Sequence, residues 1–533
     1  MPRQSGTQAR RASRARRSEA GPYNACVNTR PAPPTLRARG EERRGSTRRT
    51  AHVAGTRAGL ALFVIVLGIL MTAVDTTIVI LALPEIERSL HVSISGVIWV
   101  IVGYLLVITV LATQFGRLGD MFGRVRMYEA GFVVFIVGSA LCALASGEAT
   151  MIAYRIVQGV GGALITANSG AVIADTFAPE KRGRAYGLTT VGWGVGAILG
   201  ILLGGIIVTY IDWRWIFWIN VPTGIVAVLL ALRVLRERGA RVRERLDVPG
   251  MLLFGAGIFG VLWAMTKLST SSFSADVMGF LLGGVVLLAA FVAVERRSDA
   301  PMLDLSLFRV PTVSPTMLAS LFQGMANFAV LFLAMMYLQG VRALTPLHAS
   351  LLLVPGYLIV VLAGPIGGRL TDKLGPVLPA TVGLAIEVVA LLMFANLDLR
   401  TSVWIVVVAS IVNGVGNGLF FPANTTAVMQ AAPRELFGVA SGTLRTAANV
   451  GMVFSFAVAI LVAGRAIPHS VAFAIFVGTT HLTPGLAGSF TDGLHAAFYA
   501  SIGIMAVAAV CSATRVLHLW RTREPGVEVA AGE

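Results

Sequence analysis

Two ionisable residues lie inside long apolar stretches of this 533-residue chain. Asp75 lies within MTAVDTTIVILALPEI, and Arg155 begins the segment RIVQGVGGA. An ionised side chain is expensive inside a bilayer, so such residues mark candidate ion or proton pathways. A carboxylate paired with a guanidinium stays ionised, whereas a carboxylate that loses this partner can take up a proton. The two residue types therefore indicate proton binding and release or, alternatively, a static ion pair that fastens two helices.

The positions of Asp75 and Arg155 along their helices favour a pair. Asp75 lies roughly 25 Å from the start of an apolar window near residue 58, in a bilayer core about 30 Å thick. The window that contains Arg155 runs in the opposite direction from about residue 149, which places Arg155 roughly 9 Å below the outer face. The two side chains are thus expected within about one helical turn of the same depth.

Two short charged segments share one spacing. GRLGDMFGRVR at 116–126 and GGRLTDKLGP at 367–376 each place two glycines around an aspartate. Glycine permits a tight turn, aspartate can face a helix N-terminus, and arginine can bind carbonyls or lipid phosphates. Gly116, Asp120 and Gly123 align in this way with Gly368, Asp372 and Gly375. The simplest function for these segments is to anchor the topology of cytoplasmic loops.

The composition is that of a membrane protein. Hydrophobic residues make up 56% of the chain and charged residues only 13%, against about 25% charged in ordinary globular proteins. Most of the net charge of +16 lies in one segment, because residues 1–57 hold fourteen arginines against three glutamates. The rest of the chain is only mildly basic, so the net charge does not indicate nucleic-acid binding. This arm has no apolar periodicity, so we expect residues 1–57 to be a disordered basic cytoplasmic tail.

Apolar windows long enough to cross a bilayer recur fourteen times. Most basic residues between the windows fall on one side, so the positive-inside rule predicts that both termini are cytoplasmic. We therefore expect an all-α integral membrane protein with fourteen transmembrane helices. The windows lie near 58–80, 95–115, 127–147, 149–174, 185–209, 215–234, 249–267, 277–295, 313–338, 347–367, 378–396, 402–428, 437–464 and 492–514.

The chain contains a tandem repeat. IVQGVGGALIT at Ile156 and IVNGVGNGLFF at Ile411 share six of their first nine positions at an offset of 255 residues. The windows 249–267 and 277–295 have no counterpart, so we expect two six-helix bundles with an intervening two-helix hairpin. Parallel repeats form a central cavity and expose it alternately to each side, as secondary transporters do. The expected divisions are 1–57 (tail), 58–234 (N-terminal bundle), 235–300 (linker and hairpin), 301–518 (C-terminal bundle) and 519–533 (tail).

Several motifs together resemble the major facilitator superfamily, and specifically its fourteen-span drug:proton antiporter branch. GRLGDMFGRVR resembles the family's first cytoplasmic loop motif, and the segments around Asp75 and Arg155 resemble the branch's markers in spans 1 and 4. DWRWIFWINVPTG and YLQGVRALTPLHASLLLVPG resemble two further markers. The span 5 motif of the family has a glycine-proline kink, where this chain has Ile201 in GAILGILLGG. Its glycines still permit close helix packing, and they are Gly196, Gly200, Gly204 and Gly205.

The resemblance implies roles for particular residues. It implies proton coupling for Asp75 and Arg155. It also implies a gating role, with contacts made in one state and broken in the other, for Gly116, Arg117, Asp120, Gly123, Arg124 and Asp372. Spans 1, 4, 9 and 12 should line the cavity, where candidate substrate contacts are the amides of Gln158, Gln323, Asn327, Asn413, Asn417 and Asn424. Those amides can equally hold helices together.

The predicted cavity has few fixed charges, so we expect a small amphipathic substrate. Apolar walls are available from Phe322, Phe328, Phe420 and Phe421. Glu387 lies near the middle of span 11, which the resemblance makes peripheral. For Glu387 we expect a neutral or hydrogen-bonded structural role rather than proton carriage.

Other kinds of function find little support in the residues. The histidines form neither HExxH nor a paired cluster, so no metal site and no enzyme are expected. No lysine stands in a Walker loop, so the expected drive is an ion gradient or none, and no cofactor is expected. The resemblance implies that the drive is a proton gradient. With the resemblance, the sequence predicts a monomeric bacterial multidrug efflux transporter in the inner membrane. A gradient-independent facilitator, an exporter of a dedicated lipid or metabolite, and a membrane sensor without transport remain alternatives.

Overall fold

The computed structural model describes residues 36–177, 179–237, 246–270, 274–298, 301–303, 305, 308, 310, 312–431, 437–465 and 484–522. The described residues are helical and contain no strand, as expected for an all-α membrane protein. The N-terminal helices are α1 (Leu36–Leu90), α2 (Ile94–Phe122), α3 (Arg124–Ala143), α4 (Glu148–Thr176), α5 (Pro179–Tyr210), α6 (Trp215–Trp218) and α7 (Asn220–Val234). They are followed by α8 (Val248–Thr270) and α9 (Ala275–Glu295).

The C-terminal part of the chain repeats this arrangement of long helices. Its elements are α10 (Val313–Met336), a π-helical turn η2 (Tyr337–Val341), α11 (Pro346–Leu374), α12 (Val377–Ala395), α13 (Val403–Ala431), α14 (Phe437–Arg465) and α16 (Pro484–Thr522). Among the described residues, thirteen helices are long and apolar enough to cross a membrane. The expected window 437–464 coincides with α14, a 29-residue helix that is not among those thirteen. The exact fourteen-span arrangement therefore stays a prediction.

The chain divides into two compact units, residues 1–55 and residues 56–533. The tail over 1–57 was expected to be disordered, but α1 begins at Leu36. Residues 36–57 contain seven arginines, which favour helix, and no proline, so a helix that has formed in the membrane can extend through them. Residues 1–35 and 523–533, which include most of the two expected tails, lie outside the described residues.

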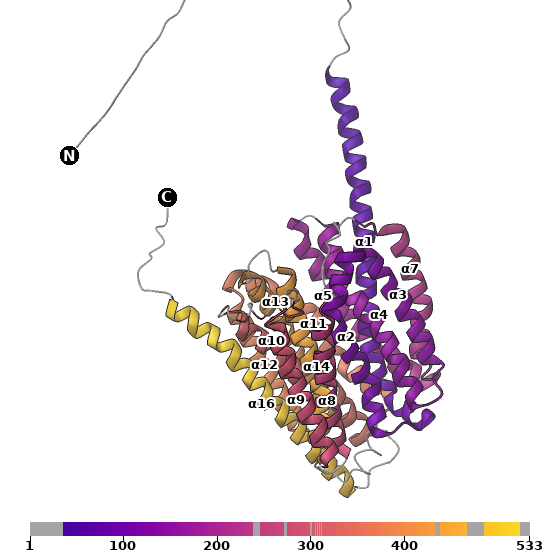
Figure 1. Cartoon of the computed structure of the whole chain (residues 1–533), viewed down its shortest axis with the longest axis vertical. Coiled ribbons are helices and arrows are strands. Elements are labelled where there is room, and N and C mark those ends of the chain that lie inside the picture. Colours follow the sequence, from indigo (N-terminus) through magenta and orange to yellow (C-terminus); the bar gives the residue numbers. More distant parts are fainter. Residues whose placement is uncertain are drawn as a thin grey trace, which may run out of the picture. The chain divides into compact units, whose positions relative to one another are not determined.

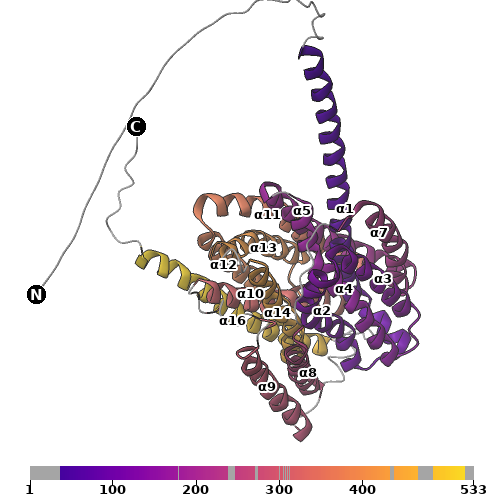
Figure 2. The same cartoon turned by 45° about the horizontal axis from the view of Figure 1, so that its top comes forward.

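Within residues 56–533 the helices pack in two groups. Helix α4 packs against α2 and α3, and α3 also packs against α7; in the other group α13 packs against α11 and α12, and α10 against α14 and α16. Figure 1 shows α3, α4 and α7 together and α10, α12 and α13 together. Helices α8 and α9 pair with each other, and α8 contacts α2 and α14. Figure 2 shows the α8–α9 hairpin beside both groups of helices. This position agrees with the two-helix hairpin expected between the two bundles.

Close contacts at four glycines hold helix α5 in place. A Cβ atom at Gly196 would lie 2.8 Å from the Leu70 carbonyl oxygen, and one at Gly200 would lie 2.0 Å from Thr77 Oγ1, both on α1. At Gly204 a Cβ would meet Ile78 of α1 at 3.0 Å, and at Gly205 it would meet Ser350 of α11 at 2.7 Å. The four glycines thus place α5 between α1 and α11, where larger side chains do not fit.

Candidate functional site

Asp75 and Arg155 form a buried ion pair between α1 and α4. Arg155 Nη1 lies 2.7 Å from Asp75 Oδ2, and the two side chains are 1% and 0% exposed. The pairing expected from helix depth is therefore present. The guanidinium also donates from Nε to the Val100 carbonyl at 3.0 Å and stacks over the Tyr104 ring, with Cζ 4.2 Å from its centre. These contacts fix the cation from α2 as well as from α1.

Gln158 completes the coordination of the carboxylate. Its Nε2 donates to Asp75 Oδ1 at 2.8 Å, and its Oε1 accepts from Arg155 Nη1 at 2.6 Å. Gln158 lies one turn after Arg155 on α4, so both side chains reach the same carboxylate from one helix face. The structure therefore places Gln158 in the ion-pair network, fully buried, rather than beside the other amides of the expected cavity.

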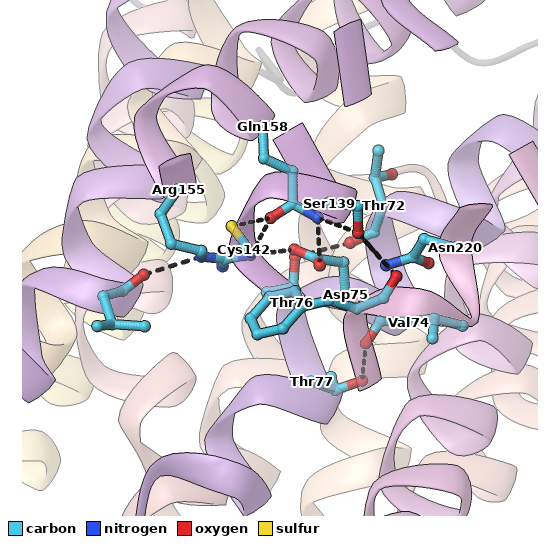
Figure 3. A network of polar contacts seen from close by, with 12 residues as sticks. Thr72, Val74, Asp75, Thr76, Thr77, Ser139, Cys142, Arg155, Gln158 and Asn220 are labelled. Atoms are coloured by element: carbon cyan, nitrogen blue, oxygen red, sulfur yellow. Dashed lines mark hydrogen bonds and ion pairs between the residues drawn. The ribbon is translucent and has the colours of Figure 1, made fainter. Parts of the chain in front are cut away.

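Ser139 of α3 connects this network to α6 and α7. Its Oγ accepts from Gln158 Nε2 at 3.1 Å and from Asn220 Nδ2 at 3.0 Å, and it donates to the Phe217 carbonyl at 3.0 Å. Figure 3 shows Ser139 between Gln158 and Asn220, with Asp75 below Gln158. Every polar residue of the network is at most 3% exposed. A proton can reach Asp75 only if the packing of these helices opens.

The first charged segment forms a compact cluster at the α2–α3 junction. Arg124 binds Asp120 Oδ1 at 2.6 Å and Asp175 Oδ1, at the end of α4, at 2.7 Å. Gly123 joins the two helices with a φ of 114°, a conformation that L side chains rarely adopt. The Glu237 carboxylate caps α3 by accepting from the backbone N–H groups of Arg124, Val125 and Arg126 at 3.0, 3.2 and 3.4 Å.

Two further residues of this segment, Arg117 and Gly116, lie outside the ion pairs of Arg124. Arg117 donates to the Pro301 carbonyl, after the α8–α9 hairpin. A Cβ atom at Gly116 would meet nothing within 4 Å, so no close contact requires a glycine there. The cluster thus connects α2, α3, α4, the segment after α7 and the segment after α9.

The second charged segment keeps the turn but lacks the ion pairs. Gly375 again joins two helices with a positive φ, of 77°. Asp372 is exposed, and it makes no ion pair with another described residue. Pro376 follows Gly375 where Arg124 follows Gly123, and Gln430 stands where the 255-residue offset would place a second Asp175. The two repeats therefore share a backbone turn but differ in charge.

This difference permits a matched test of gating. Asp120→Ala removes one carboxylate from Arg124 and breaks the contact across the α2–α3 junction, so substrate flux should fall strongly. Insertion should remain normal, because pairs that are partly exposed contribute only about 1 kcal/mol or less each. Asp372→Ala serves as the control and should retain most of the flux. Equal flux of wild type and Asp120→Ala at equal membrane abundance would contradict the gating role.

The amides of the second repeat form a cluster of their own. Asn327 Nδ2 donates to Asn417 Oδ1 at 2.9 Å, Asn417 Nδ2 to Asn413 Oδ1 at 2.6 Å, and Asn413 Nδ2 to Asn327 Oδ1 at 2.8 Å. These three bonds close a ring between α10 and α13. Gln323 Nε2 also donates to Asn417 Oδ1, at 3.2 Å. Asn327 and Asn413 are partly exposed, whereas Gln323 and Asn417 are buried.

Asn424 lies apart from this ring. Its Nδ2 donates to the Thr316 carbonyl at 3.3 Å, near the start of α10, and its buried Oδ1 has no hydrogen-bond partner among the described residues. Of the expected aromatic walls, Phe420 is fully buried, whereas Phe328 is partly exposed and meets Trp193 of α5 edge to face at 6.4 Å. Trp193 and Phe328 therefore bring one aromatic side chain from each half of the chain into contact.

Residues 65–456 match the sequence pattern described as the Major Facilitator Superfamily. The chain belongs to the major facilitator superfamily. Its all-helical fold agrees with solved transporters of this superfamily, such as a bacterial homolog of the human lysosomal transporter Spinster in an inward-facing and occupied conformation. That structure has a TM-score of 0.62 at 16% identity and covers 87% of this chain and 98% of its own. The superfamily consists of transporters, and the chain is a multi-pass membrane protein rather than an enzyme.

Relatives within the superfamily include resistance and export proteins. The Tetracenomycin C resistance and export protein of Streptomyces glaucescens is 30% identical over 76% of each chain. The multidrug resistance protein Stp of Mycobacterium tuberculosis is 33% identical over 75% of this chain and 74% of its own. The riboflavin transporter RibZ of Clostridioides difficile is 29% identical over 75% of this chain and 86% of its own. The chain thus falls in the drug-efflux branch of the superfamily.

Several residues of the site carry no clear signal in the sequence. Ser139 is a neutral polar residue in an apolar window, and Asn220 lies within the marker DWRWIFWINVPTG, but nothing in their spacing indicates that they meet. Trp193 is one aromatic among many. Asp175 and Glu237 follow apolar windows directly, so their charge could have marked them as partners of the α2–α3 junction, but only the folded chain shows which helix ends they reach.

Proposed function

We propose that this transporter exports small amphipathic molecules by proton antiport, with the Asp75–Arg155 pair as the coupling element. The observation that carries the proposal is the closed network in which Asp75 accepts from both Arg155 and Gln158. While the network is intact, the carboxylate charge is balanced. When a change in helix packing withdraws Arg155, Asp75 becomes an uncompensated charge in the membrane and binds a proton instead.

The expected substrate follows from the chemistry of the cavity candidates. Asn327 and Asn413 present amides that can donate and accept hydrogen bonds, and Trp193 and Phe328 present aromatic faces. Such a surface suits a molecule with a large apolar body and a small polar or cationic group. The names of the resistance and export relatives support drugs or toxic metabolites as substrates.

Location and drive complete the proposal. We place the transporter in the cytoplasmic membrane of a bacterium as a monomer with both termini inside, driven by the proton gradient without a cofactor. The resemblance to a riboflavin transporter favours export of a dedicated metabolite as the second candidate. A gradient-independent facilitator and a membrane sensor without transport are further outcomes of the test.

Efflux from intact cells distinguishes these functions. Cells that express the full chain are loaded with a panel of cationic dyes and antibiotics, and efflux is followed with and without a protonophore. Antiport predicts active efflux of several compounds that stops when the gradient collapses. Efflux that continues down the substrate gradient indicates a facilitator. Transport of one compound indicates a dedicated exporter, and no flux of any compound would contradict transport.

The aromatic pair gives a prediction on affinity. Trp193→Ala removes an aromatic ring that is 39% exposed and that can pair with a phenyl ring of a bound ligand, and aromatic pairs contribute about 0.5–1.5 kcal/mol. Binding of tetraphenylphosphonium, a probe with an apolar body and a positive charge, should therefore weaken about two- to tenfold. Trp193→Phe keeps an aromatic ring and should retain most of the affinity. An unchanged Kd in Trp193→Ala, measured on purified protein, would remove Trp193 from the binding surface.

A further inference from the structure

A second carboxyl is buried in the C-terminal half of the transporter, and it has no ion pair among the described residues. Glu387 of α12 is 0% exposed. Its two oxygens accept hydrogen bonds from one donor, Gln323 Nε2 of α10, at 3.3 and 3.1 Å. Asp75, by contrast, is held by a guanidinium. An uncompensated carboxylate in the membrane is expensive, and a bound proton removes that cost.

The helices around Glu387 offer no countercharge near it. Helices α10, α12 and α13 contain no other acidic or basic residue. Arg515 of α16 donates to Ser512 of its own helix and to Thr316 near the start of α10. His495 of α16 contacts the Leu397 carbonyl, beyond the end of α12. None of the remaining titratable side chains that the structure describes on the neighbouring α11 and α16 has a described bond to Glu387; these are His348, Tyr357, Arg369, Asp372, Lys373, Asp492, Tyr499 and Cys511.

Comparison of the repeats shows that the carboxyl occupies an unusual place. A Cβ at Gly161 would meet the Phe135 backbone and side chain, and a Cβ at Gly416 would meet Glu387 Cγ at 2.6 Å. Gly161 and Gly416 are related by the 255-residue offset of the repeat. Glu387 thus occupies the contact position that Phe135 has in the N-terminal half. A carboxyl group lies where the first half has an apolar ring.

The C-terminal half lacks a cation at the position equivalent to Arg155. Ser410 stands at the repeat position of Arg155, and its buried Oγ has no hydrogen-bond partner among the described residues. Asn413 stands at the position of Gln158 and bonds Asn327 of α10, as Gln158 bonds Asp75 of α1. The C-terminal half therefore has an amide at the position of Gln158 but no arginine at the position of Arg155. Its buried carboxyl, Glu387, does not lie at the position of Asp75.

A chain of amides connects Glu387 to the surface proposed for the substrate. Gln323 Nε2 is shared between the Glu387 carboxyl and Asn417 Oδ1, and Asn417 belongs to the closed ring with Asn327 and Asn413. An ionised carboxyl only accepts hydrogen bonds, whereas a protonated one also donates. Gaining a proton therefore favours turning the Gln323 oxygen toward Glu387, which removes a donor from Asn417 and reorients the ring.

In place of the structural role expected from the sequence, we propose that Glu387 is a second proton-binding site of this transporter and that Gln323 relays its protonation to the amide ring formed by Asn327, Asn413 and Asn417. The proton comes from water when the ring side of the site is open and forms the O–H bond of the carboxyl; it returns to water when that bond breaks. The relay to the substrate rests on the proposed function, whereas proton binding by Glu387 does not.

Infrared difference spectroscopy of the purified full-length protein tests proton binding directly. Wild type should show a protonated carboxyl band that disappears as the pH is raised. The band should be lost in Glu387→Gln and kept in Glu85→Gln, whose side chain is 44% exposed. Asp75 can contribute a carboxyl band of its own, so the test is the difference between the spectra of wild type and Glu387→Gln. A difference of zero, or one that does not respond to pH, overturns the proposal. Retained thermal stability shows that Glu387→Gln is folded.

A second pair of variants tests the relay. Gln323→Leu should move the titration midpoint of the band, because it removes the only described donor to Glu387. Asn424→Ala is the control, since Asn424 bonds Thr316 and lies outside the ring. Tetraphenylphosphonium should shift the band of wild type; binding without a shift overturns the relay. Absence of tetraphenylphosphonium binding counts against the proposed substrate class, and the pH titration still decides whether Glu387 binds a proton.

Discussion

Asp75→Asn is expected to bind tetraphenylphosphonium but to lose gradient-driven efflux, down to the rate of cells without the transporter. The substituted amide has nearly the shape of the carboxyl and can still accept a hydrogen bond from Gln158, so the helix packing around α1 should persist. It cannot take up and release a proton at any physiological pH. Coupling to the gradient is therefore lost, while the amide ring and the Trp193–Phe328 surface remain.

Three measurements separate this loss from misfolding. Membrane abundance and thermal stability of Asp75→Asn show whether the protein assembles. Binding of tetraphenylphosphonium to the purified protein shows whether the cavity is intact. Exchange of labelled for unlabelled substrate, which needs alternating access but no net proton movement, should continue. If Asp75→Asn still concentrates substrate outward against a gradient, Asp75 is not the essential proton carrier.

The depth of a helix residue can be predicted from sequence more reliably than the direction of its side chain. Counting residues along two antiparallel windows placed Asp75 and Arg155 at one depth, and the structure shows them 2.7 Å apart. The same count does not show that Ser139 and Asn220 complete the network, because that depends on how α3 and α7 are rotated about their own axes. Rotation follows from packing contacts such as that of Gly138 with the Gln158 backbone.

Gln158 shows that equivalent positions of the two repeats can have different surroundings. The family resemblance placed Gln158 and Asn413 together among the amides of one expected cavity. In the structure Asn413 is partly exposed in the amide ring, whereas Gln158 is fully buried against Asp75 and Arg155. The backbone repeat was recognisable because glycine positions constrain helix packing. The different positions of the buried charges were not recognisable, because a few residue differences between the halves change the positions of these charges without changing the fold.

The charged cluster at the α2–α3 junction shows the same limit at a helix end. The turn glycines Gly123 and Gly375 could be predicted from their spacing, because each requires a positive φ. The ion pair of Arg124 with Asp175 could not, since Asp175 is distant in sequence and its helix ends beside the turn only in the folded chain. Ion pairs hold the α2–α3 junction, whereas Asp372 at the α11–α12 junction is exposed and makes no ion pair with another described residue. The helix ends are therefore held more firmly in the N-terminal half than in the C-terminal half.

Arg155→Ala should have the largest effect on stability. It leaves Asp75 buried without a countercharge and also removes the bonds to the Val100 carbonyl and Gln158. Loss of one partner of a buried ion pair costs about 3–5 kcal/mol. The variant should therefore unfold at a markedly lower temperature in detergent, and its residual efflux should have an altered pH dependence, because the proton on Asp75 no longer competes with a guanidinium.

Arg155→Lys and the double variant Asp75→Asn/Arg155→Ala are the controls that identify the cause. Lysine restores the charge, but its single ammonium cannot reproduce the planar set of bonds to Asp75, Val100 and Gln158, so we expect partial recovery of stability and little recovery of efflux. The double variant removes both charges and should be more stable than Arg155→Ala alone, with a coupling energy that a double-mutant cycle measures. Additive losses, or an Arg155→Ala protein with wild-type stability and pH dependence, would show that the pair neither fastens α1 to α4 nor sets the charge of Asp75.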